Sequence, residues 1–400
     1  MESNNQNILI ICERTPRYNG GSGDQKILYT SYDQMSNIHF CVINDKNEIE
    51  TSLENVYYCK IQKDIFVSST KWRYADLIKY FSDKQDRFIE SEQYISDILR
   101  NIQEIIRKRN IRLLVFEQTG ILMWSWYKYF SDNVKCVLRI HDSHYHYLLS
   151  DAKTRSRFFS KIALLGSASV QKKHEKKHIT QWDQVHFLSQ KEYLYYCAEY
   201  HNISKKIIYA PSSIVKEQNK YFAKKKKQTD ILFVGTMSWK PNSDAVKWFL
   251  DTVLPIIKSE LPDVKVKIVG KNALQKINST DNNVDLVGFV ESLDNEYKST
   301  KLFINPSQSG GGIKVKLMEA ASIGLPVVST SDGVSGFMEN INDYLIVKDK
   351  PKEYADAIIQ LLENENMREE YSRKMYEYSN EYFDININQK LWKAEIDKIL

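Results

Sequence analysis

Short apolar segments alternate with longer amphipathic segments along the first half of the chain. Helical periodicity begins at Asp24, and Trp72–Arg109 is a long, charged segment of helical period. The short apolar segments are Ile8–Cys12, Ile38–Ile43, Val56–Ile61, Leu113–Glu117, Cys136–His141, Val185–Leu188 and Lys206–Tyr209. Strands that alternate with helices are typical of a parallel sheet covered on both faces. The first half therefore predicts a doubly wound α/β domain.

The second half repeats this alternation. Helices are predicted over Ser243–Leu261, Gly312–Ile323 and Lys352–Glu363. The predicted strands are Ile231–Val234, Val264–Val269, Val284–Val287, Leu302–Asn305, Val327–Ser329 and Tyr344–Val347. The final segment, Met367–Leu400, is charged, helical in pattern and longer than a second domain needs. We expect a second α/β domain, followed by a helical segment that returns toward the first.

Domain boundaries follow from these patterns. Lys224–Asp230 is charged and lacks apolar periodicity, so it reads as a linker. The predicted division is an N-terminal Rossmann-like domain at 1–223, a linker at 224–230, a C-terminal Rossmann-like domain at 231–366 and a helical segment at 367–400. In open α/β sheets, ligands bind at the carboxyl ends of the strands. Two such domains facing each other predict an active site in the cleft between them.

Composition and charge narrow the possible partners. The chain of 400 residues is 42% hydrophobic and 27% charged, which is ordinary for a globular protein. Its formal net charge of +5 gives no nucleic-acid footprint. Two basic runs exceed the average: Lys172, Lys173, Lys176 and Lys177 form the first, and Lys224–Lys227 is the second. Such runs fit a solvated surface or a linker, and alternatively a contact with an anionic membrane.

Cysteine usage and the chain start indicate a compartment. The five cysteines are scattered, without paired or metal-ligand spacing, which is typical of reduced thiols in a cytosolic protein. Met1–Gln6 is polar, and no stretch approaches the roughly 20 apolar residues of a membrane span. We therefore expect a cytoplasmic protein, either free or peripheral at the inner face of the membrane, and no metal site.

The strongest chemical signal is the segment Ser309–Glu319, where three consecutive glycines join a predicted strand to a predicted helix. Glycine allows the backbone to turn tightly and approach a ligand, and a helix start offers unpaired N–H groups and the positive end of its dipole. Lys316 and Glu319 share one helix face, while Lys314 points elsewhere. A cation and a carboxylate there suit phosphate oxygens and ribose hydroxyls. The alternative is a strand–helix turn whose glycines serve packing only.

Further markers accompany the glycine-rich segment in a fixed order. They are Phe233–Ala245, Lys267–Gly270, Val287–Val290, Ser309–Glu319 and Ala321–Val328. As a set over residues 230–365 they resemble the donor domain of GT-B-fold glycosyltransferases, most closely the retaining family-four (group 1) bacterial enzymes. The resemblance is weaker over residues 1–215. It implies a GT-B fold of two Rossmann-like domains facing across a cleft, with the acceptor bound by the first and the nucleotide sugar by the second.

The resemblance implies roles for individual donor-site residues. Gly288, Phe289 and Val290 would lie against the base. The loop would surround the diphosphate with backbone N–H groups, and its residues are Gly310, Gly311, Gly312, Ile313, Lys314 and Val315. Lys316 would reach a phosphate, and Glu319 matches the second Glu of the family's Glu–seven residues–Glu motif, which holds the ribose. Both side chains are predicted to be catalytic.

The chain departs from the family pattern at two places. The first Glu of the motif, which commonly contacts the donor sugar, falls on Gly311. The Arg and Lys that often follow the first donor-domain strand are replaced by Thr236 and Pro241. Lys240, beside the second of these, is a candidate substitute, and Gly235 at the strand end is also counted among the donor-binding residues. The sugar contacts are therefore not readable from the sequence.

The first half carries two further candidates. Gly20 and Gly21 follow the first strand, as in the glycine loop that related enzymes fold over the donor phosphates, or as in an ordinary connecting loop. His141 ends a predicted strand, at the place where related enzymes project a His toward the reacting sugar. It is predicted to be catalytic. His144 and His146 follow in a predicted loop and suit either acceptor binding or exposure to solvent.

The resemblance implies a hexosyltransferase-type enzyme that moves a sugar from a nucleotide-diphosphate donor to an acceptor hydroxyl with retention. The acceptor is a glycan, a lipid-linked saccharide or a glycoprotein, read by loops such as His141–Asp151 and by Trp72–Arg109. No cofactor or catalytic metal is expected. A GT-B epimerase or hydrolase is the alternative enzyme, and Gly311 gives weight to a non-catalytic partner subunit. The donor base, the sugar, the acceptor and the oligomeric state are not specified.

Overall fold

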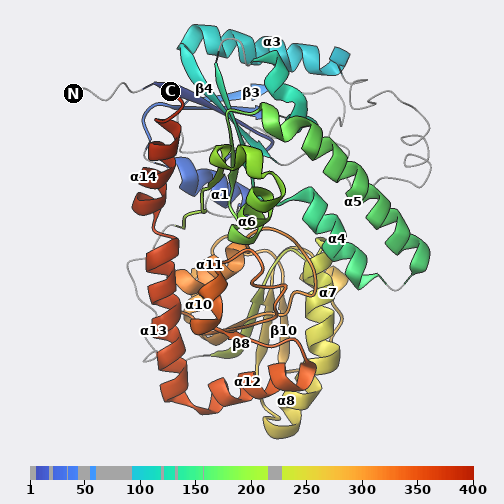
Figure 1. Ribbon diagram of the computed structural model, residues 1–400. Helices are drawn as coiled ribbons and strands as arrows, with labels where there is room; N and C mark the ends of the chain where they lie inside the picture. Colours follow the sequence, from blue (N-terminus) through green and yellow to red (C-terminus); the bar gives the residue numbers. More distant parts are fainter. Residues whose placement is uncertain are drawn as a thin grey trace. The chain divides into compact units, whose positions relative to one another are not determined.

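The structure is a computed structural model that describes residues 6–17, 21–33, 35–43, 55–59, 92–118, 121–130, 134–155, 157–214 and 228–400 (Figure 1). Predictions for Gly20, for Lys224–Lys227 and for residues 72–91 lie outside these ranges. The chain divides into two compact units. Unit 1 comprises Met1–Arg17, Ser31–Ala210 and Gln389–Leu400, and unit 2 comprises Tyr18–Thr30 and Pro211–Asn388.

Unit 1 is built on a parallel sheet whose described strands run in the order β3-β2-β1-β4-β5-β6-β7. Their bounds are β1 (Asn7–Cys12), β2 (Ile38–Ile43), β3 (Val56–Cys59), β4 (Ile111–Gln118), β5 (Lys135–Ile140), β6 (Gln184–Phe187) and β7 (Ile207–Tyr209). The strand order reverses between β1 and β4, which pair directly. The carboxyl ends of these strands are therefore the place where this fold binds ligands.

Helices cover the sheet of unit 1. The described helices that belong wholly to unit 1 are α3 (Glu92–Arg109), η3 (Ile121–Tyr129), α4 (His144–Thr154), α5 (Phe158–His178), η4 (Ile179–Gln181), α6 (Gln190–Glu199) and η5 (His201–Lys206). Two more, α1 (Gly23–Tyr32) and α14 (Ile385–Ile396), are divided between the units. A cluster of buried aromatic residues, including Phe116 and Trp182, fills the space between helices and sheet. The apolar strands and the covering helices match the alternation in the sequence.

The C-terminal helix α14 belongs to unit 1 from Gln389 onward. The Gln389 amide donates to the carbonyl of Asp33 at 2.9 Å, and the Gln184 amide donates to the carbonyl of Glu395 at 3.0 Å. The chain therefore ends against the domain in which it begins. In contrast, most of α1 belongs to unit 2, because the division falls between Thr30 and Ser31.

Unit 2 is a second parallel sheet in the order β10-β9-β8-β11-β12-β13. The strands are β8 (Thr229–Val234), β9 (Val266–Val269), β10 (Val284–Val287), β11 (Thr300–Asn305), β12 (Val327–Ser329) and β13 (Ile346–Val347). Its helices are α7 (Lys240–Trp248), a π-helical segment (Phe249–Val253), α8 (Leu254–Glu260), α9 (Ala273–Lys276), α10 (Asp294–Lys298), α11 (Val315–Ser322), η7 (Glu339–Asp343), α12 (Pro351–Glu363) and α13 (Glu365–Tyr382). The order reverses between β8 and β11, the strand that leads into the glycine-rich segment.

Two local predictions are wrong. The predicted helix Gly312–Ile323 begins only at Val315, because Gly310 and Gly312 adopt φ values of +123° and +59°, which no right-handed helix contains. The predicted loop His141–Asp151 is largely the helix α4, whose first turn is capped by the Ser143 side chain accepting from the N–H of His146.

Candidate functional site

The glycine-rich segment forms an extended loop between β11 and α11. A second loop, after β12, supports it: a Cβ added to Gly336 would lie 2.2 Å from the carbonyl oxygen of Gly312. Such a distance is sterically forbidden, so only glycine lets these two backbones approach. The left-handed Gly312 and the close-fitting Gly336 together fix the course of the loop ahead of the helix.

The first turn of α11 points its backbone N–H groups toward this loop. Lys314 is the N-cap residue, but its side chain does not cap the helix. Instead its amine donates to the carbonyls of Gly311 at 2.6 Å and Gly312 at 3.2 Å. The amine therefore turns back over the loop. The N–H of Leu317 bonds to the Lys314 carbonyl, and the N–H groups ahead of it are those that have no partner within a helix. The helix dipole adds positive potential at the same point.

Lys316 is the second residue of α11 and contacts residues of the first strand and helix of the domain. Its amine donates to the Oδ1 atom of Asn242 at 2.9 Å and lies 4.2 Å from the centroid of the Phe233 ring. Burial, followed by repulsion from Lys314, lowers the pKa of Lys316 to about 7. A neighbouring glycine makes this arrangement possible, since a Cβ on Gly235 would lie 2.7 Å from the Asn242 side-chain nitrogen.

Glu319 lies one turn further along the same helix face, as the spacing predicts. Lys26 of α1 forms an ion pair with its Oε1 atom, and both side chains are nearly buried. The Tyr297 hydroxyl donates to Oε2 at 3.1 Å. The segment after β1 also reaches the helix start, because a Cβ on Gly23 would lie 3.2 Å from Val315. Lys26, Tyr297 and Gly23 belong to the surroundings of the site and were not predicted.

The predicted base-binding residues form an open, apolar surface after β10. Phe289 is 52% exposed, and the Lys271 amine lies 5.1 Å from the centroid of its ring. Among the described residues, no atom lies within 4 Å of a Cβ built on Gly288, so space remains above the backbone there. Val290 packs against the core of the domain. An exposed aromatic ring beside an open glycine suits the face of a flat base.

Lys240 does not contact Lys316 or the glycine-rich loop through the ion pair that it forms. Its amine pairs with Asp244 on the surface of α7, and both side chains are well exposed. The residue that contacts Lys316 from this part of the chain is Asn242, two positions later. Gly21, the described member of the predicted glycine pair, lies two residues before α1 begins.

A second constellation lies at the carboxyl ends of β4 and β5 in unit 1. Glu117 and Arg139 face each other in the register of the two strands, and both are buried. The Arg139 Nη1 atom donates to Glu117 at 3.0 Å and to the Ser31 hydroxyl at 2.8 Å. The remaining bonds to the carboxylate come from the Tyr32 hydroxyl and from the Nε2 atom of His141. The predicted His141 is thus held from behind by a buried carboxylate.

Charge pairing decides the ionisation of this constellation. Burial alone raises the pKa of Glu117, but the Arg139 and His141 charges and the hydrogen bonds outweigh it and lower the pKa to about 2. Burial alone would lower the pKa of Arg139, but the Glu117 carboxylate beside it outweighs burial, and the pKa of Arg139 is raised. Glu117 is therefore a carboxylate at neutral pH, which only accepts hydrogen bonds.

The pairing with Glu117 engages the Nε2 atom of the His141 ring and leaves Nδ1 for another partner. A carboxylate acceptor requires a proton on Nε2, so Nδ1 accepts a hydrogen bond when the ring is neutral and donates one when the ring is protonated. Nδ1 is buried and has no hydrogen-bond partner among the described residues. A hydroxyl group is the simplest ligand for it. Glu117 was not predicted, although Glu117 and Arg139 are single opposite charges at matching ends of two apolar segments.

His144 and His146, predicted in a loop, lie in the first turn of α4. Burial lowers the pKa of His144 to about 4. Burial, with the charges of Lys191 and Lys172, also lowers the pKa of His146 to about 4. Both residues are half-buried. No group of His, Cys, Asp and Glu that could hold a metal occurs among the residues that the structure describes.

Comparison with known proteins identifies the second domain. Residues 228–364 match the sequence model of the family described as glycosyl transferases group 1. The second domain is a group 1 glycosyltransferase domain. This confirms the resemblance read from the markers between Phe233 and Val328.

Two curated relatives cover parts of the chain. An uncharacterized 44.6 kDa protein in the cps region of Klebsiella pneumoniae is 27% identical over 259 residues, which are 62% of this chain and 65% of that protein. A poly(glycerol-phosphate) alpha-glucosyltransferase of Bacillus subtilis is 28% identical over 144 residues, which are 32% of this chain and 20% of that protein. Each match therefore spans less than two thirds of the relative's own length.

Solved structures show the fold of the whole chain. Sucrose-phosphate synthase from Thermosynechococcus elongatus has a TM-score of 0.69 at 13% identity and covers 98% of this chain and 99% of its own. HepE of Anabaena, in complex with UDP-glucose, has a TM-score of 0.66 at 11% identity over 98% and 99%. The predicted GT-B fold is confirmed. No helix among the described residues is long and apolar enough to cross a membrane.

Proposed function

We propose that this chain transfers a sugar from a nucleotide-diphosphate donor to an acceptor hydroxyl. The observation that carries the proposal is the arrangement on α11, where helix-start N–H groups, Lys316 and Glu319 follow one another at the switch point of the sheet. A diphosphate and a ribose need these groups in this order. The group 1 family match supports sugar transfer over other uses of a nucleotide site.

Catalysis in this proposal comes mainly from stabilising the departing diphosphate. Negative charge develops on its oxygens as the glycosidic bond breaks, and fixed N–H groups and the Lys316 cation meet that charge without reorganisation. Glu319 binds the ribose hydroxyls after releasing Lys26 or sharing its carboxylate with it. Phe289 stacks against the base. The diphosphate then accepts the proton of the acceptor hydroxyl, so that retention needs no separate general base.

His141 takes a positioning role in this proposal. Its Nδ1 atom accepts a hydrogen bond from a hydroxyl of the transferred sugar or of the acceptor, while Glu117 holds the ring from the other side. These contacts do not select one base or one sugar for the donor. UDP-glucose is the first donor to test, because the HepE structure contains it and the Bacillus relative is named a glucosyltransferase. A polymeric acceptor is supported by the Bacillus relative, whose name includes poly(glycerol-phosphate). A lipid-linked saccharide is the other acceptor to test.

The test begins with thermal-shift screening against UDP, GDP, ADP, CMP and dTDP sugars, because a ligand of the folded state raises its apparent stability. The donor found is then incubated with the protein and saccharide acceptors, and products are followed by mass spectrometry. We expect sugar on the acceptor and a released nucleoside diphosphate. Wild-type rates in both His141→Ala and Lys316→Ala would show that the site is assigned wrongly.

A further inference from the structure

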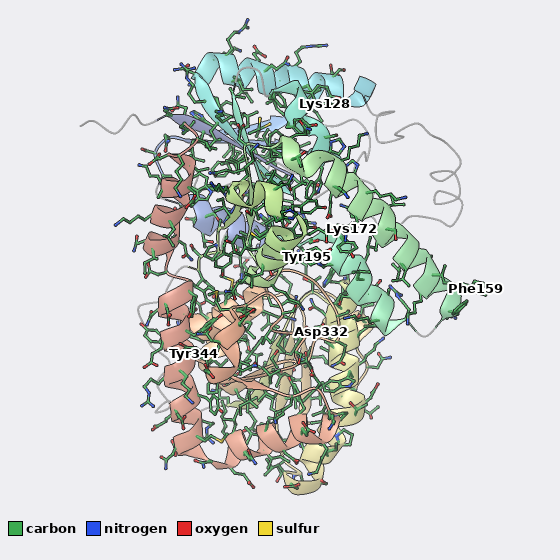
Figure 2. The ribbon with its side chains drawn as sticks, in the orientation of Figure 1. Lys128, Phe159, Lys172, Tyr195, Asp332 and Tyr344 are labelled. Carbon is green, nitrogen blue, oxygen red and sulfur yellow. The ribbon has the colours of Figure 1, made fainter. Side chains whose placement is uncertain are left out.

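Helix α5 carries an exposed stripe with an apolar half and a basic half. Near the beginning of the helix, four large apolar side chains are 41% to 72% exposed: Phe158, Phe159, Ile162 and Leu165. The rings of Phe158 and Phe159 contact each other edge to face. Figure 2 shows Phe159 at the tip of the helix, pointing away from the ribbon.

The stripe follows from the helical period. At 100° per residue, Phe158, Ile162 and Leu165 lie on one line along α5, and Lys173 and Lys176 continue the same line toward the end of the helix. Both lysines are exposed. The opposite face, which includes Gln171, His174 and Glu175, is buried, and α5 packs there against α4 (Figure 1). The exposed stripe is therefore a surface, not an unfilled part of the core.

Basic residues surround the stripe, and two of them, Arg155 and Lys172, pair with Asp151 and Glu199. Residues 152–174 contain no Asp or Glu, and they contain six basic residues: Lys153, Arg155, Arg157, Lys161, Lys172 and Lys173. Arg157 and Lys161 are exposed beside the two phenylalanines. Apolar side chains ringed by cations at the surface of a helix are the pattern that inserts into the boundary of an anionic bilayer.

We propose that α5 docks this protein on an anionic lipid membrane, with Phe158, Phe159, Ile162 and Leu165 in the acyl boundary and Lys173 and Lys176 on the phosphates. A bilayer is favoured over a second copy of the chain because the stripe carries no carboxylate to complement its own lysines. The proposal deepens the proposed function, since it would bring the enzyme to a lipid-linked acceptor. Docking itself does not depend on sugar transfer.

Vesicle sedimentation of the full chain tests the docking. Wild type should bind phosphatidylcholine vesicles weakly and vesicles with one quarter phosphatidylglycerol strongly, and salt should weaken the binding. The pair F158S/F159S should lose at least about tenfold in partitioning, because the inserted rings supply the apolar contact. The pair K173Q/K176Q should lose about 25-fold, at roughly fivefold for each removed charge.

Matched controls lie on α14. Leu391 is 55% exposed and Lys393 is exposed, so L391S and K393Q remove comparable groups outside the stripe. Both should bind vesicles as wild type does. All variants should keep nucleotide binding in calorimetry, which separates a failure of docking from a failure of the proposed function.

Three results would overturn the docking. The first is that the wild-type protein does not bind vesicles that contain phosphatidylglycerol. The second is that F158S/F159S binds these vesicles as strongly as wild type does. The third is a wild-type dimer in analytical ultracentrifugation that F158S/F159S abolishes while wild-type vesicle binding is absent. That result would assign the stripe to a second copy.

Discussion

Nucleotide binding should take up a proton at Lys316. Burial and Lys314 lower the pKa of its amine to about 7, while the diphosphate that we place beside it favours the cation. A nucleotide sugar has both phosphates esterified and no group of its own that titrates near neutral pH. Any uptake linked to this lysine therefore reports the approach of the diphosphate to the amine.

The size of the uptake follows from the pKa of the free protein. With a pKa of about 7, roughly one tenth of the Lys316 amines are neutral at pH 6, about half at pH 7 and about nine tenths at pH 8. If the bound diphosphate raises the pKa well above 8, binding takes up about 0.1, 0.5 and 0.9 proton at these three values. Because binding then takes up a proton, the affinity for the nucleotide sugar must fall as the pH rises, by close to tenfold for each pH unit above pH 8.

Calorimetric titration measures this uptake. At each pH the binding enthalpy is recorded in buffers of different ionisation enthalpy, and the slope gives the protons taken up. K316R is the matched control, because the guanidinium stays charged throughout and should bind the diphosphate without uptake near neutral pH. K316M should bind about 10- to 150-fold more weakly, the loss expected for a hydrogen bond to a charged group. If wild type takes up no proton on binding at pH 8, or if K316R takes up as many protons as wild type, Lys316 does not bind the diphosphate.

Three further predictions concern the surroundings of the site. In urea unfolding at pH 7, Glu117→Gln should lower the free energy of unfolding by about 3 kcal/mol, because the pKa of the native carboxylate is lowered from 4.5 to about 2. This contribution is fully present above pH 4.5 and disappears as the pH falls to 2. Equal free energies of unfolding for the two proteins at pH 7 would contradict the pairing. Glu319→Ala should weaken ribonucleotide binding about 10- to 150-fold and abolish the preference over the deoxy analogue in calorimetry; a preference that survives would exclude Glu319 as the ribose ligand. Gly336→Ala should lower both stability and nucleotide affinity, since its Cβ would meet the carbonyl of Gly312, whereas Gly166→Ala, with open space around it, should be neutral or stabilising by about 0.5–1 kcal/mol in thermal unfolding.

The strands of the two sheets could be predicted from the sequence because parallel strands are buried on both faces; their order in each sheet comes from the structure alone. Ile8–Cys12 is an uninterrupted apolar run and Ile38–Ile43 is broken only by His39, and the structure pairs the two strands in parallel. The fold class followed from the alternation alone. On α11, the three-residue spacing of Lys316 and Glu319 correctly indicated a shared face, because a single helix has a fixed period.

Helices α4 and α5 were missed. The inner face of α5 contains Gln171, His174 and Glu175, and Glu175 accepts a hydrogen bond from Tyr196 of α6, so a regular apolar period does not mark this helix in the sequence. The start of α11 was placed too early because left-handed glycines are compatible with several backbone courses. A sequence also gives no strand register, which is what brings Glu117 opposite Arg139 behind His141.

If the site on α11 binds and activates a nucleotide-diphosphate sugar, nucleoside diphosphate must be released from the donor found in the thermal-shift screen. This release is measured in the presence of acceptor for wild type and for K316M. We expect release coupled to transfer in wild type and a rate about 100- to 1,000-fold lower in K316M, as expected when one stabiliser of the leaving group is removed. Equal rates in the two proteins, or binding of none of the five classes of sugar nucleotide, would contradict it.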